Sequence, residues 1–251
     1  MLGNFQKCLA VTLGYEGGKA NNPKDPGGKT NKGVTQATYD AWRKSHGLAK
    51  RDVFLITDGD VSAIYSENYW RAVKGDDLAA GVDLATFDAA VNSGPARALK
   101  WLMAAIGGTD VETVKKLCAK RLGYMQTLKI WQTFKKGWLS RVTGIEAKGV
   151  AWALARSTSP SEARKELAKE STTANATAKK QAAGAGASGT ATTAGGGDAI
   201  LNPQHADQVA GWVLGGLLAA GALVAAILII RAIIHRQRAA AYAAEAEAVQ
   251  S

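Results

Sequence analysis

The sequence contains one run that no single soluble globule accommodates, the charge-free residues from Val209 to Ile230. With the sequence VAGWVLGGLLAAGALVAAILII, the run would form about 33 Å of helix, enough to cross a bilayer. We predict one transmembrane helix over residues 209–234, followed by a tail over 235–251. The G-x-x-x-G spacing of Gly211 and Gly215 would allow two such helices to self-associate. The alternative, a buried hairpin helix, needs an equally apolar partner, and no neighbouring segment has that composition.

Charges on the two sides of this run predict its orientation. Arg231, Arg236 and Arg238 follow it, whereas the twenty residues before it contain Asp198 and Asp207 but no Lys or Arg. Because Lys and Arg are enriched on the cytoplasmic side of membrane helices, we expect a single-pass inner-membrane protein with a cytoplasmic carboxyl end and a periplasmic N-terminal domain. The first residues do not form a typical signal peptide, since a lysine interrupts their apolar stretch.

The segment before the predicted membrane helix is almost free of large side chains. From Ser171 to Ala199 it contains no Leu, Ile, Val, Met or aromatic residue, so burial cannot offset the entropy of ordering it. We predict a flexible linker over 171–208, with an r.m.s. span of about 35 Å if it behaves as a Gly/Ser-type coil. A short solvated helix is expected before it, over 157–170.

Charge and cysteine usage exclude several function classes. The formal net charge is +10, from 31 Lys and Arg against 21 Asp and Glu, but no run of basic residues is longer than a pair. Such dispersed charge is first of all interpreted as solvated surface charge, and as a partner an anionic envelope is favoured over nucleic acid. Two cysteines and three scattered histidines lack the spacing of zinc ligands, so we predict neither a metal nor a cofactor.

The first 156 residues have a mainly helical period. Apolar residues recur at three- and four-residue intervals in four stretches, which predict helices over 5–16, from a cap near Asp58 to Trp70, over 84–92 and over 95–106. Pro95 is well placed as a first helical residue after the break at Gly94. The segment from Gly17 to Lys29 is rich in turn formers, and residues 30–35 are expected to add a short strand. We predict a mainly α fold with a small β element.

Two carboxylates mark the most chemically informative part of this region. Glu16 ends the first predicted helix and lies within roughly 20° of Phe5 and Leu9 on the helical wheel. Burial on that apolar stripe would favour the protonated carboxyl that a general acid requires. Asp25 follows after a turn-rich loop, so the chain can fold back and bring two carboxylates to one cleft, as in glycoside hydrolysis. The alternatives are a lysine partner for Glu16 and a turn-forming role for Asp25.

Five motifs resemble those of the glycoside hydrolase family 108 muramidases, which are phage and bacterial peptidoglycan hydrolases of the endolysin kind. The similarity covers about residues 2–155 and excludes the linker and the membrane helix. The matching segments are Tyr15 to Gly18, Asn22 to Thr35, Ile64 to Trp70, Asp88 to Pro95 and Gly137 to Val142.

The resemblance implies a lysozyme-like α+β catalytic domain over residues 1–108 and a small helical peptidoglycan-binding domain over 109–156. Glu16 matches the catalytic acid of the family. Asp25 follows it at the spacing of the second carboxylate in the wider phage-lysozyme pattern. Two positions depart from the family, since Lys19 and Lys32 stand where aromatic residues are usual. These lysines would add positive charge at the rim of the cleft.

The resemblance also suggests residues that contact the substrate. The threonine of the phage-lysozyme pattern is replaced by an asparagine here, so the water-positioning role is open among Thr30, Asn31 and Thr35. Further substrate-binding residues implied by the resemblance are Tyr69, Trp70, Asp88 and Asn92. Residues expected to bind the wall are Tyr124, Trp131, Trp138 and Arg141. For the aromatic residues in both sets, core packing is the alternative role.

The function that the sequence predicts is therefore a membrane-tethered N-acetylmuramidase that acts in cell lysis or wall remodelling. Its substrate would be peptidoglycan, and its reaction would be hydrolysis of the β-1,4 bond between N-acetylmuramic acid and N-acetylglucosamine. One alternative is a lytic transglycosylase, which cleaves the same bond without water. Another is a membrane protein that keeps the fold but only binds the wall or assists secretion.

Overall fold

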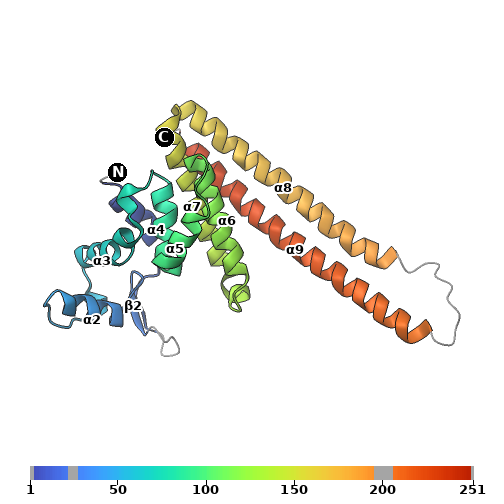
Figure 1. Cartoon of the computed structure of the whole chain (residues 1–251), viewed down its shortest axis with the longest axis horizontal. Helices are drawn as coiled ribbons and strands as arrows, with labels where there is room; N and C mark the ends of the chain where they lie inside the picture. Colours follow the sequence, from blue (N-terminus) through green and yellow to red (C-terminus); the bar gives the residue numbers. More distant parts are fainter. Residues whose placement is uncertain (1–2, 22–27, 195–205, 250–251) are drawn as a thin grey trace. The chain divides into compact units, whose positions relative to one another are not determined.

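The computed structural model describes residues 3–21, 28–194 and 206–249, and its side chains over the same ranges except for 188–219. The chain divides into two compact units, Met1–Ser159 and Pro160–Ser251, each of which is described by itself (Figure 1). The first unit is mainly helical with a small antiparallel sheet, which confirms the predicted fold class.

The first unit begins with α1 (Phe5–Leu13), the small sheet and α2. A chain of short helical segments then leads to four longer helices. The sheet consists of β1 (Ala20–Asn21), β2 (Lys29–Asn31) and β3 (Val34–Thr35). The helical elements after it are α2 (Gln36–Ser45), η1 (Val53–Leu55), α3 (Asp58–Tyr65), η2 (Ser66–Trp70), η3 (Arg71–Val73), η4 (Gly75–Asp77), α4 (Val82–Ser93), α5 (Pro95–Met103), α6 (Asp110–Gln126) and α7 (Trp131–Ser157).

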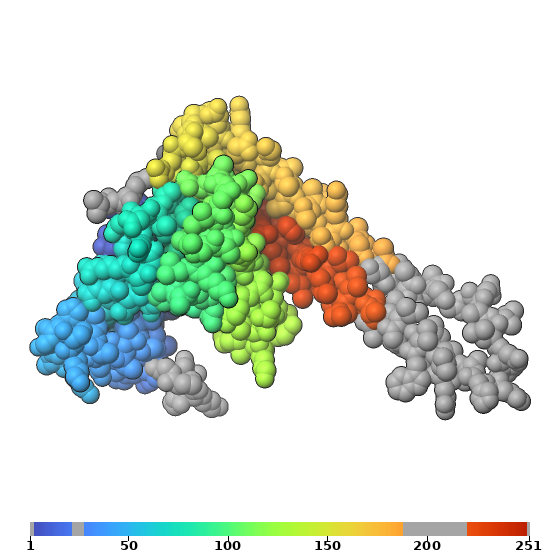
Figure 2. Space-filling view, viewed as in Figure 1, coloured from blue at the N-terminus to red at the C-terminus, as the bar shows by residue number. Residues whose placement is uncertain are grey.

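The expected strand over 30–35 is instead a hairpin, β2 and β3, closed by Lys32 and Gly33. Both turn residues have left-handed φ values, of 50° and 75°, as a two-residue type I′ turn requires. In the paired register Thr30 lies opposite Thr35, and Asn31 lies opposite Val34. Figure 2 shows the blue residues of the hairpin and α2 at one end of this unit, next to the teal residues of α3.

α4 is the centre of the helical part. Every residue from Val82 to Ala90 is buried, and α1, α5, α6 and α7 pack around it. α4 and α5 correspond to the two helices that the sequence predicts, with the break at Gly94 and with Pro95 at the start of α5. At the start of α4, a Cβ on Gly81 would lie 2.0 Å from the carbonyl oxygen of Gly149 in α7, so the two backbones touch there.

A hydrogen-bonded carboxylate also holds the start of α1 against α4. Asp83 is fully buried, and it accepts hydrogen bonds from the side chain of Asn4 at 2.6 Å and from the backbone N–H groups of Gly81 and Leu84. Burial raises the pKa of Asp83 in spite of these hydrogen bonds. This contact fixes the beginning of the helix that leads to Glu16.

The helix after α3 changes its pitch before it enters the core. η2 is a five-residue π-helix that continues directly from α3, and the 3₁₀ turn η3 follows it. At its end, Trp70 is 2% exposed, and its ring centroid lies 5.4 Å from that of Phe5 and 5.5 Å from that of Phe87. Trp70 is therefore a core residue, and this corrects its expected role in substrate binding.

A buried ion cluster joins α4 to α6 and α7. The Asp88 carboxylate, fully buried in α4, lies 2.7 Å from Nη1 of Arg121 and 2.9 Å from Nη2 of Arg141. Burial alone would raise the pKa of Asp88, but the two guanidinium groups outweigh it and lower that pKa. The expected wall-binding helices are thus packed into the same compact unit as the catalytic part.

The second unit is a pair of antiparallel helices, α8 (Pro160–Ala194) and α9 (Ala206–Ala248), which lie side by side in Figure 1. The hydroxyl of Ser171 in α8 donates a hydrogen bond of 2.9 Å to the carbonyl oxygen of Ala239 in α9. The faces that meet are rich in small residues, and the buried residues of the two helices are Ala163, Leu167, Ala174, Ala178, Ala185, Ala232, Ile234, Ala239, Tyr242 and Ala246.

α8 corrects two expectations about this region. The short helix expected over 157–170 continues to Ala194, so much of the predicted flexible linker over 171–208 is helical. Alanine has the highest helix propensity of all residues, and an alanine face allows close helix packing without large side chains. The alternative of a buried hairpin helix needs a partner for α9. α8 is that partner, and it is rich in alanine rather than in large apolar residues.

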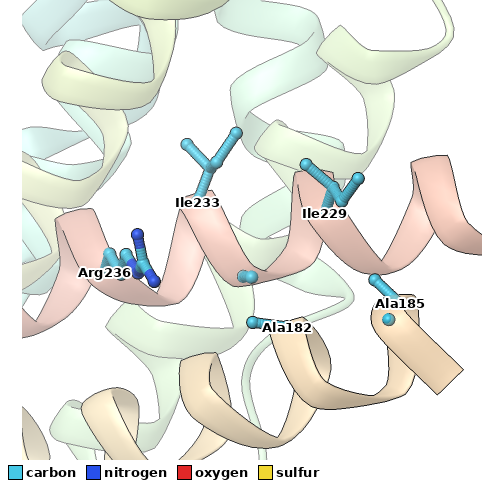
Figure 3. A pocket seen from close by; sticks show the side chains of 7 residues that line it. Ala182, Ala185, Ile229, Ile233 and Arg236 are labelled. Atoms are coloured by element: carbon cyan, nitrogen blue, oxygen red, sulfur yellow. The ribbon is translucent and has the colours of Figure 1, made fainter.

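α9 contains the stretch that is long and apolar enough to cross a membrane, Ala220–Ala248, with a mean hydropathy of 1.5. It overlaps the predicted span over 209–234, whose first part, with Gly211 and Gly215, lies outside the described side chains. Figure 3 shows Ala182 and Ala185 of α8 directed at α9, whereas Ile229 and Ile233 point away from α8. Both isoleucines are exposed, at 50% and 44%, so α9 presents an apolar face that α8 leaves uncovered.

Asp88→Asn should destabilise the first unit by about 3–5 kcal/mol at pH 7, because it leaves two buried guanidinium groups without their carboxylate. The lowered pKa of Asp88 means that its stabilising effect is complete above its unfolded pKa of about 3.9. The effect is lost as the pH falls through the still lower pKa of the folded state. Urea unfolding of residues 1–159, measured from pH 7 to pH 2, checks both points.

The matched control is Asp77→Asn, which removes an exposed aspartate and should change the stability by no more than about 0.5 kcal/mol. A loss below about 1 kcal/mol in Asp88→Asn at pH 7, or a loss that does not shrink in acid, would contradict the role given to the cluster.

Candidate active site

Glu16 lies in the turn after α1, three residues beyond its last helical residue, Leu13. Its backbone N–H still donates to the carbonyl oxygen of Leu13, at 3.1 Å, so the turn remains attached to the helix. The Glu16 side chain is 18% exposed. The catalytic candidate is thus nearly buried, as expected, but it stands on a turn rather than on the last turn of the helix.

The carboxylate of Glu16 is paired with a guanidinium group. Oε1 of Glu16 lies 2.8 Å from Nη1 of Arg141, and the same guanidinium also holds Asp88 through Nε and Nη2, at 2.9–3.1 Å. Burial opposes the charge of Arg141, but Asp88 and Glu16 outweigh it and raise the pKa of Arg141. The surroundings of Glu16 therefore differ from the apolar stripe that the helical wheel predicts, since a cation faces it.

Two tyrosines from the end of α3 and from η2 face the same carboxylate. The ring centroids of Tyr65 and Tyr69 are 5.5 Å apart. Burial, and after it the negative charge of Glu16, raise the pKa of both hydroxyl groups, so both keep their protons at neutral pH. The hydroxyl of Tyr65 donates a hydrogen bond of 2.9 Å to the carbonyl oxygen of Lys32, which ties α3 to the hairpin turn.

The hairpin turn comes close to the carboxylate at Gly33. A Cβ on this glycine would lie 2.3 Å from the hydroxyl oxygen of Tyr65 and 2.9 Å from Oε2 of Glu16. The left-handed φ of 75° at Gly33 is a second reason for glycine. The turn and Arg141 therefore confine the Glu16 carboxylate from two sides.

The three residues considered for water positioning have different surroundings. Asn31 is buried, and its side-chain amide donates to the carbonyl oxygen of Val53 at 3.3 Å. Thr35 is the N-cap of α2, where its hydroxyl accepts from the backbone N–H of Thr38. Thr30 is half-buried and donates to the carbonyl oxygen of Gly28. As paired residues, Thr30 and Thr35 share the face of the sheet opposite to Asn31.

Of the remaining expected substrate contacts in the described residues, the structure places Tyr69 near Glu16 and puts Asp88 and Asn92 in other surroundings. Asp88 is completely buried and surrounded by guanidinium groups, so its position offers support for Arg141 rather than contact with a sugar. Asn92 is half-buried near the end of α4 and accepts a hydrogen bond from Ser93. Tyr69 lies beside Glu16, as the resemblance implies. Asp25 lies outside the described residues.

The expected wall-binding residues do not form one exposed surface. Arg141 is paired with Glu16 and is 7% exposed, so it does not lie on an open wall-binding surface. Trp131 is 4% exposed and belongs to the core. Tyr124 is half-buried between Trp101 and the guanidinium of Arg97, which lies 4.4 Å from its ring centroid.

Trp138 retains partial exposure. It stacks on Phe134, which is half exposed, with ring centroids 5.7 Å apart. These two rings form the aromatic surface at the beginning of α7. Within the described residues, no three His, Cys, Asp or Glu side chains meet in a way that could hold a metal ion.

The two lysines that depart from the family pattern both lie near the small sheet. Nζ of Lys19 lies 5.7 Å from the ring centroid of Phe54, and Lys32 is paired with the exposed Asp58. Lys29 also lies over the Phe54 ring and forms an ion pair of 2.6 Å with Asp52. Carboxylates thus offset part of the positive charge expected at this rim.

Sequence reasoning did not assign Gly33 and Tyr65 to the site and placed Arg141 elsewhere. One signal was available for Tyr65, because it precedes Tyr69 by four residues and so shares a helix face with it. Arg141 is far from Glu16 in the sequence, and no local pattern connects the two.

An α-rich unit with a small antiparallel sheet and a confined carboxylate beside its hairpin defines a lysozyme-like glycosidase fold. Residues 9–94 match the family described as glycosyl hydrolase 108. The solved structure of Brucella abortus SagA is 39% identical in sequence, with a TM-score of 0.54, and the match covers 61% of this chain and 97% of SagA. No curated protein matches the chain.

The chain therefore belongs to the glycosyl hydrolase 108 family. Membership of this family makes it a glycoside hydrolase of the peptidoglycan-hydrolase, lysozyme-like kind. The match to the family begins within α1 and ends at Gly94, so it includes Glu16, the hairpin and the two tyrosines.

Gly33→Ala should lower peptidoglycan hydrolysis by about two orders of magnitude, because the added methyl group displaces the Glu16 carboxylate and the Tyr65 hydroxyl. The matched control is Gly47→Ala, which has a similar φ of 68° but no atom within 4 Å of its Cβ. Both variants share the cost of a left-handed alanine, about 1–2 kcal/mol. Turbidity of a cell-wall suspension measures the rates, and equal losses in both variants would contradict the steric argument.

Proposed function

We propose that the protein is an N-acetylmuramidase in which Glu16 is the general acid. The observation that supports this role is the position of the Glu16 carboxylate, 18% exposed and confined by the hairpin turn and by Arg141 in a chain of this family. The substrate is the β-1,4 bond between N-acetylmuramic acid and N-acetylglucosamine in peptidoglycan.

In the proposed reaction, Glu16 gives its proton to the glycosidic oxygen as the bond from the anomeric carbon to that oxygen breaks. The electron pair of the bond stays with the leaving oxygen, and positive charge develops on the sugar ring. A water molecule bonds to the anomeric carbon and loses a proton to a base. Asp25, by its resemblance to the family, either orients this water or stabilises the charged transition state.

The neutral tyrosines can contribute to substrate binding. Tyr69 keeps its proton beside Glu16, so its hydroxyl group can donate a hydrogen bond to a sugar oxygen or to the carboxylate. The Tyr65 hydroxyl already donates to the carbonyl oxygen of Lys32, so it can only accept a hydrogen bond from the sugar. Tyr69 is the more exposed of the two and is the residue we assign to the sugar. The half-exposed face of the sheet with Thr30 and Thr35 extends the proposed contact area.

The aromatic surface of Phe134 and Trp138 is the part of α7 best suited to wall binding. Phe134 is 50% exposed, and the two stacked rings offer an apolar face on which a sugar ring can lie. Trp131 beneath Trp138, at 6.2 Å between ring centroids, supports this surface from the core. Of the expected wall-binding residues, Trp138 is the one we retain for direct contact.

Glu16→Gln should reduce the turnover of purified peptidoglycan by about 10²–10⁴-fold, since the amide cannot supply the proton. Binding of the variant to the wall should persist. Glu112→Gln is the matched control, because a glutamine at that position keeps the capping box of α6 and should leave the rate unchanged. Near wild-type turnover in Glu16→Gln would contradict the assignment.

Mass analysis of the released muropeptides tests the type of reaction. Hydrolysis adds one water to each cleaved bond and leaves a reducing end, whereas a transglycosylase leaves a 1,6-anhydro product. We expect reducing ends.

α9 gives this enzyme a proposed membrane anchor. α9 contains a stretch long and apolar enough to cross a bilayer, and Arg231, Arg236 and Arg238 follow its charge-free run, which ends at Ile230. We assign the carboxyl end to the cytoplasm and the catalytic unit to the periplasmic side of the inner membrane, where peptidoglycan is within reach. Lysis or remodelling of the wall is the process that such an anchored muramidase would serve.

This orientation has a consequence for the second unit. The carboxyl-terminal half of α9 packs along α8, with Ser171 bonded to Ala239. Since α8 is joined directly to the catalytic unit, the two helices must separate for their ends to lie on opposite sides of a membrane. In the paired state, Ser171 and Ala239 are therefore on the same side of a membrane.

Cysteines introduced by Ser171→Cys and Ala239→Cys test the orientation with a short thiol-reactive crosslinker. In detergent the two helices can pair, and we expect crosslinking. In intact membranes the proposed orientation places the two positions on opposite sides, so crosslinking should be lost. The control is the parent chain, whose Cys8 and Cys118 are buried. Efficient crosslinking in intact membranes would contradict the periplasmic placement of the enzyme.

A further inference from the structure

Arg141 occupies a position that a simple ion pair does not explain. Its guanidinium contacts two carboxylates at once, Glu16 through Nη1 and Asp88 through Nε and Nη2. All three nitrogens are engaged, so the planar fork of an arginine fits here and an ammonium group does not. Arg141 is 7% exposed, which removes most of the solvent screening from both contacts.

The turn that carries Glu16 is fitted to the same face of α7. The Arg141 guanidinium lies 5.8 Å from the ring centroid of Tyr15, the residue before Glu16. One turn further along α7, a Cβ on Gly144 would lie 2.1 Å from the Tyr15 hydroxyl oxygen, so the missing side chain leaves room for that hydroxyl. Arg141 and Gly144 together determine where the catalytic turn rests.

The far side of Arg141 is fixed as well. Asp88 is fully buried and also bound by Arg121, at 2.7 Å, so it cannot follow a movement of Arg141 toward solvent. The cluster thus contains two carboxylates and two guanidinium groups in the order Glu16, Arg141, Asp88, Arg121. Asp88, the inner carboxylate, holds Arg141 in place. The Nη1 group of Arg141 is thereby directed at Glu16, the outer carboxylate.

We infer that Arg141 is a positioning residue that aims Glu16 and stabilises the carboxylate left after Glu16 has given its proton to the glycosidic oxygen. This inference rests on the proposed role of Glu16 as the acid. The proton moves to the leaving oxygen, and the negative charge that remains on Glu16 meets the charge of Arg141 at 2.8 Å. Arg141 therefore favours the product of the proton transfer over its reactant.

Among the described residues, the groups that face Glu16 from α3, η2 and the hairpin turn do not supply this charge. Tyr65 of α3 and Tyr69 of η2 are neutral, and the hairpin turn presents the backbone at Gly33. Asp88 lies behind Arg141 and weakens its effect on Glu16 by competing for the same cation. Removal of Arg141 and removal of Asp88 should therefore act on Glu16 in opposite directions.

The test is the pH dependence of kcat/KM on soluble muropeptide fragments, measured with the full-length protein in detergent. In Arg141→Met the carboxylate loses its counter-charge, so the alkaline limb of the pH profile should move to higher pH. The maximal rate should fall at least about tenfold because the carboxyl is no longer aimed. In Asp88→Asn the alkaline limb should move to lower pH.

Arg141→Lys tests the two parts of the inference separately. It keeps the positive charge but loses the fork, so its alkaline limb should stay near that of the wild type while its rate falls. Arg156→Met removes an exposed arginine from the same helix and should change neither quantity. Thermal unfolding of each variant separates a loss of folding from a loss of positioning, and the movement of the alkaline limb in Asp88→Asn keeps the inference falsifiable if Arg141→Met does not fold.

A fall in rate without any movement of the alkaline limb in Arg141→Met would overturn the inference, since a purely structural role lowers activity equally at every pH. Limbs that move in the same direction in Arg141→Met and Asp88→Asn would overturn it too. Failure of the proposed function has a different result, because Glu16→Gln would then remain active. An inactive Glu16→Gln together with an unmoved limb in Arg141→Met refutes the inference about Arg141 alone.

Discussion

The burial of Asp88 is the constraint on which the arrangement of the first unit depends. A carboxylate with no access to water must be neutralised by partners in the fold, and α6 and α7 each supply one guanidinium group for this purpose. The two helices are thereby fixed against α4. Arg141 also binds a second carboxylate, that of Glu16, so the residue that neutralises Asp88 also fixes the position of Glu16. The stability of the unit and its proposed catalytic site thus depend on one set of charges.

The second determinant of the site is a point of close contact. The hairpin turn approaches Glu16 through a residue without a side chain, and the hydroxyl of Tyr65 holds the neighbouring carbonyl group of Lys32. An acidic side chain on a turn would otherwise have several rotamers available, and their loss would cost entropy at each turnover. Contact with the turn on one side and with Arg141 on the other leaves Glu16 few alternatives before substrate arrives.

Much of the fold could be predicted from local patterns. The break at Gly94, the proline that begins α5 and the mainly helical period all depend on residues close in sequence. The family motif pointed to Glu16, but not to its partner, because Arg141 is brought to it only when α7 packs on α4. The predicted length of the helix before the linker was wrong for another reason. The linker prediction depends on the lack of large apolar side chains, whereas alanine stabilises α8 through its helix propensity and close packing.

The π-helix between α3 and η3 has a consequence for insertions and deletions. A π turn holds one residue more than an α turn, so the helix can direct Tyr69 to the catalytic carboxylate and the next residue, Trp70, into the aromatic core. If one residue were lost between Ser66 and Trp70, the helix would return to the α pitch. Every side chain from there to Val73 would then rotate by about 100°, and the catalytic and core faces would no longer be in phase.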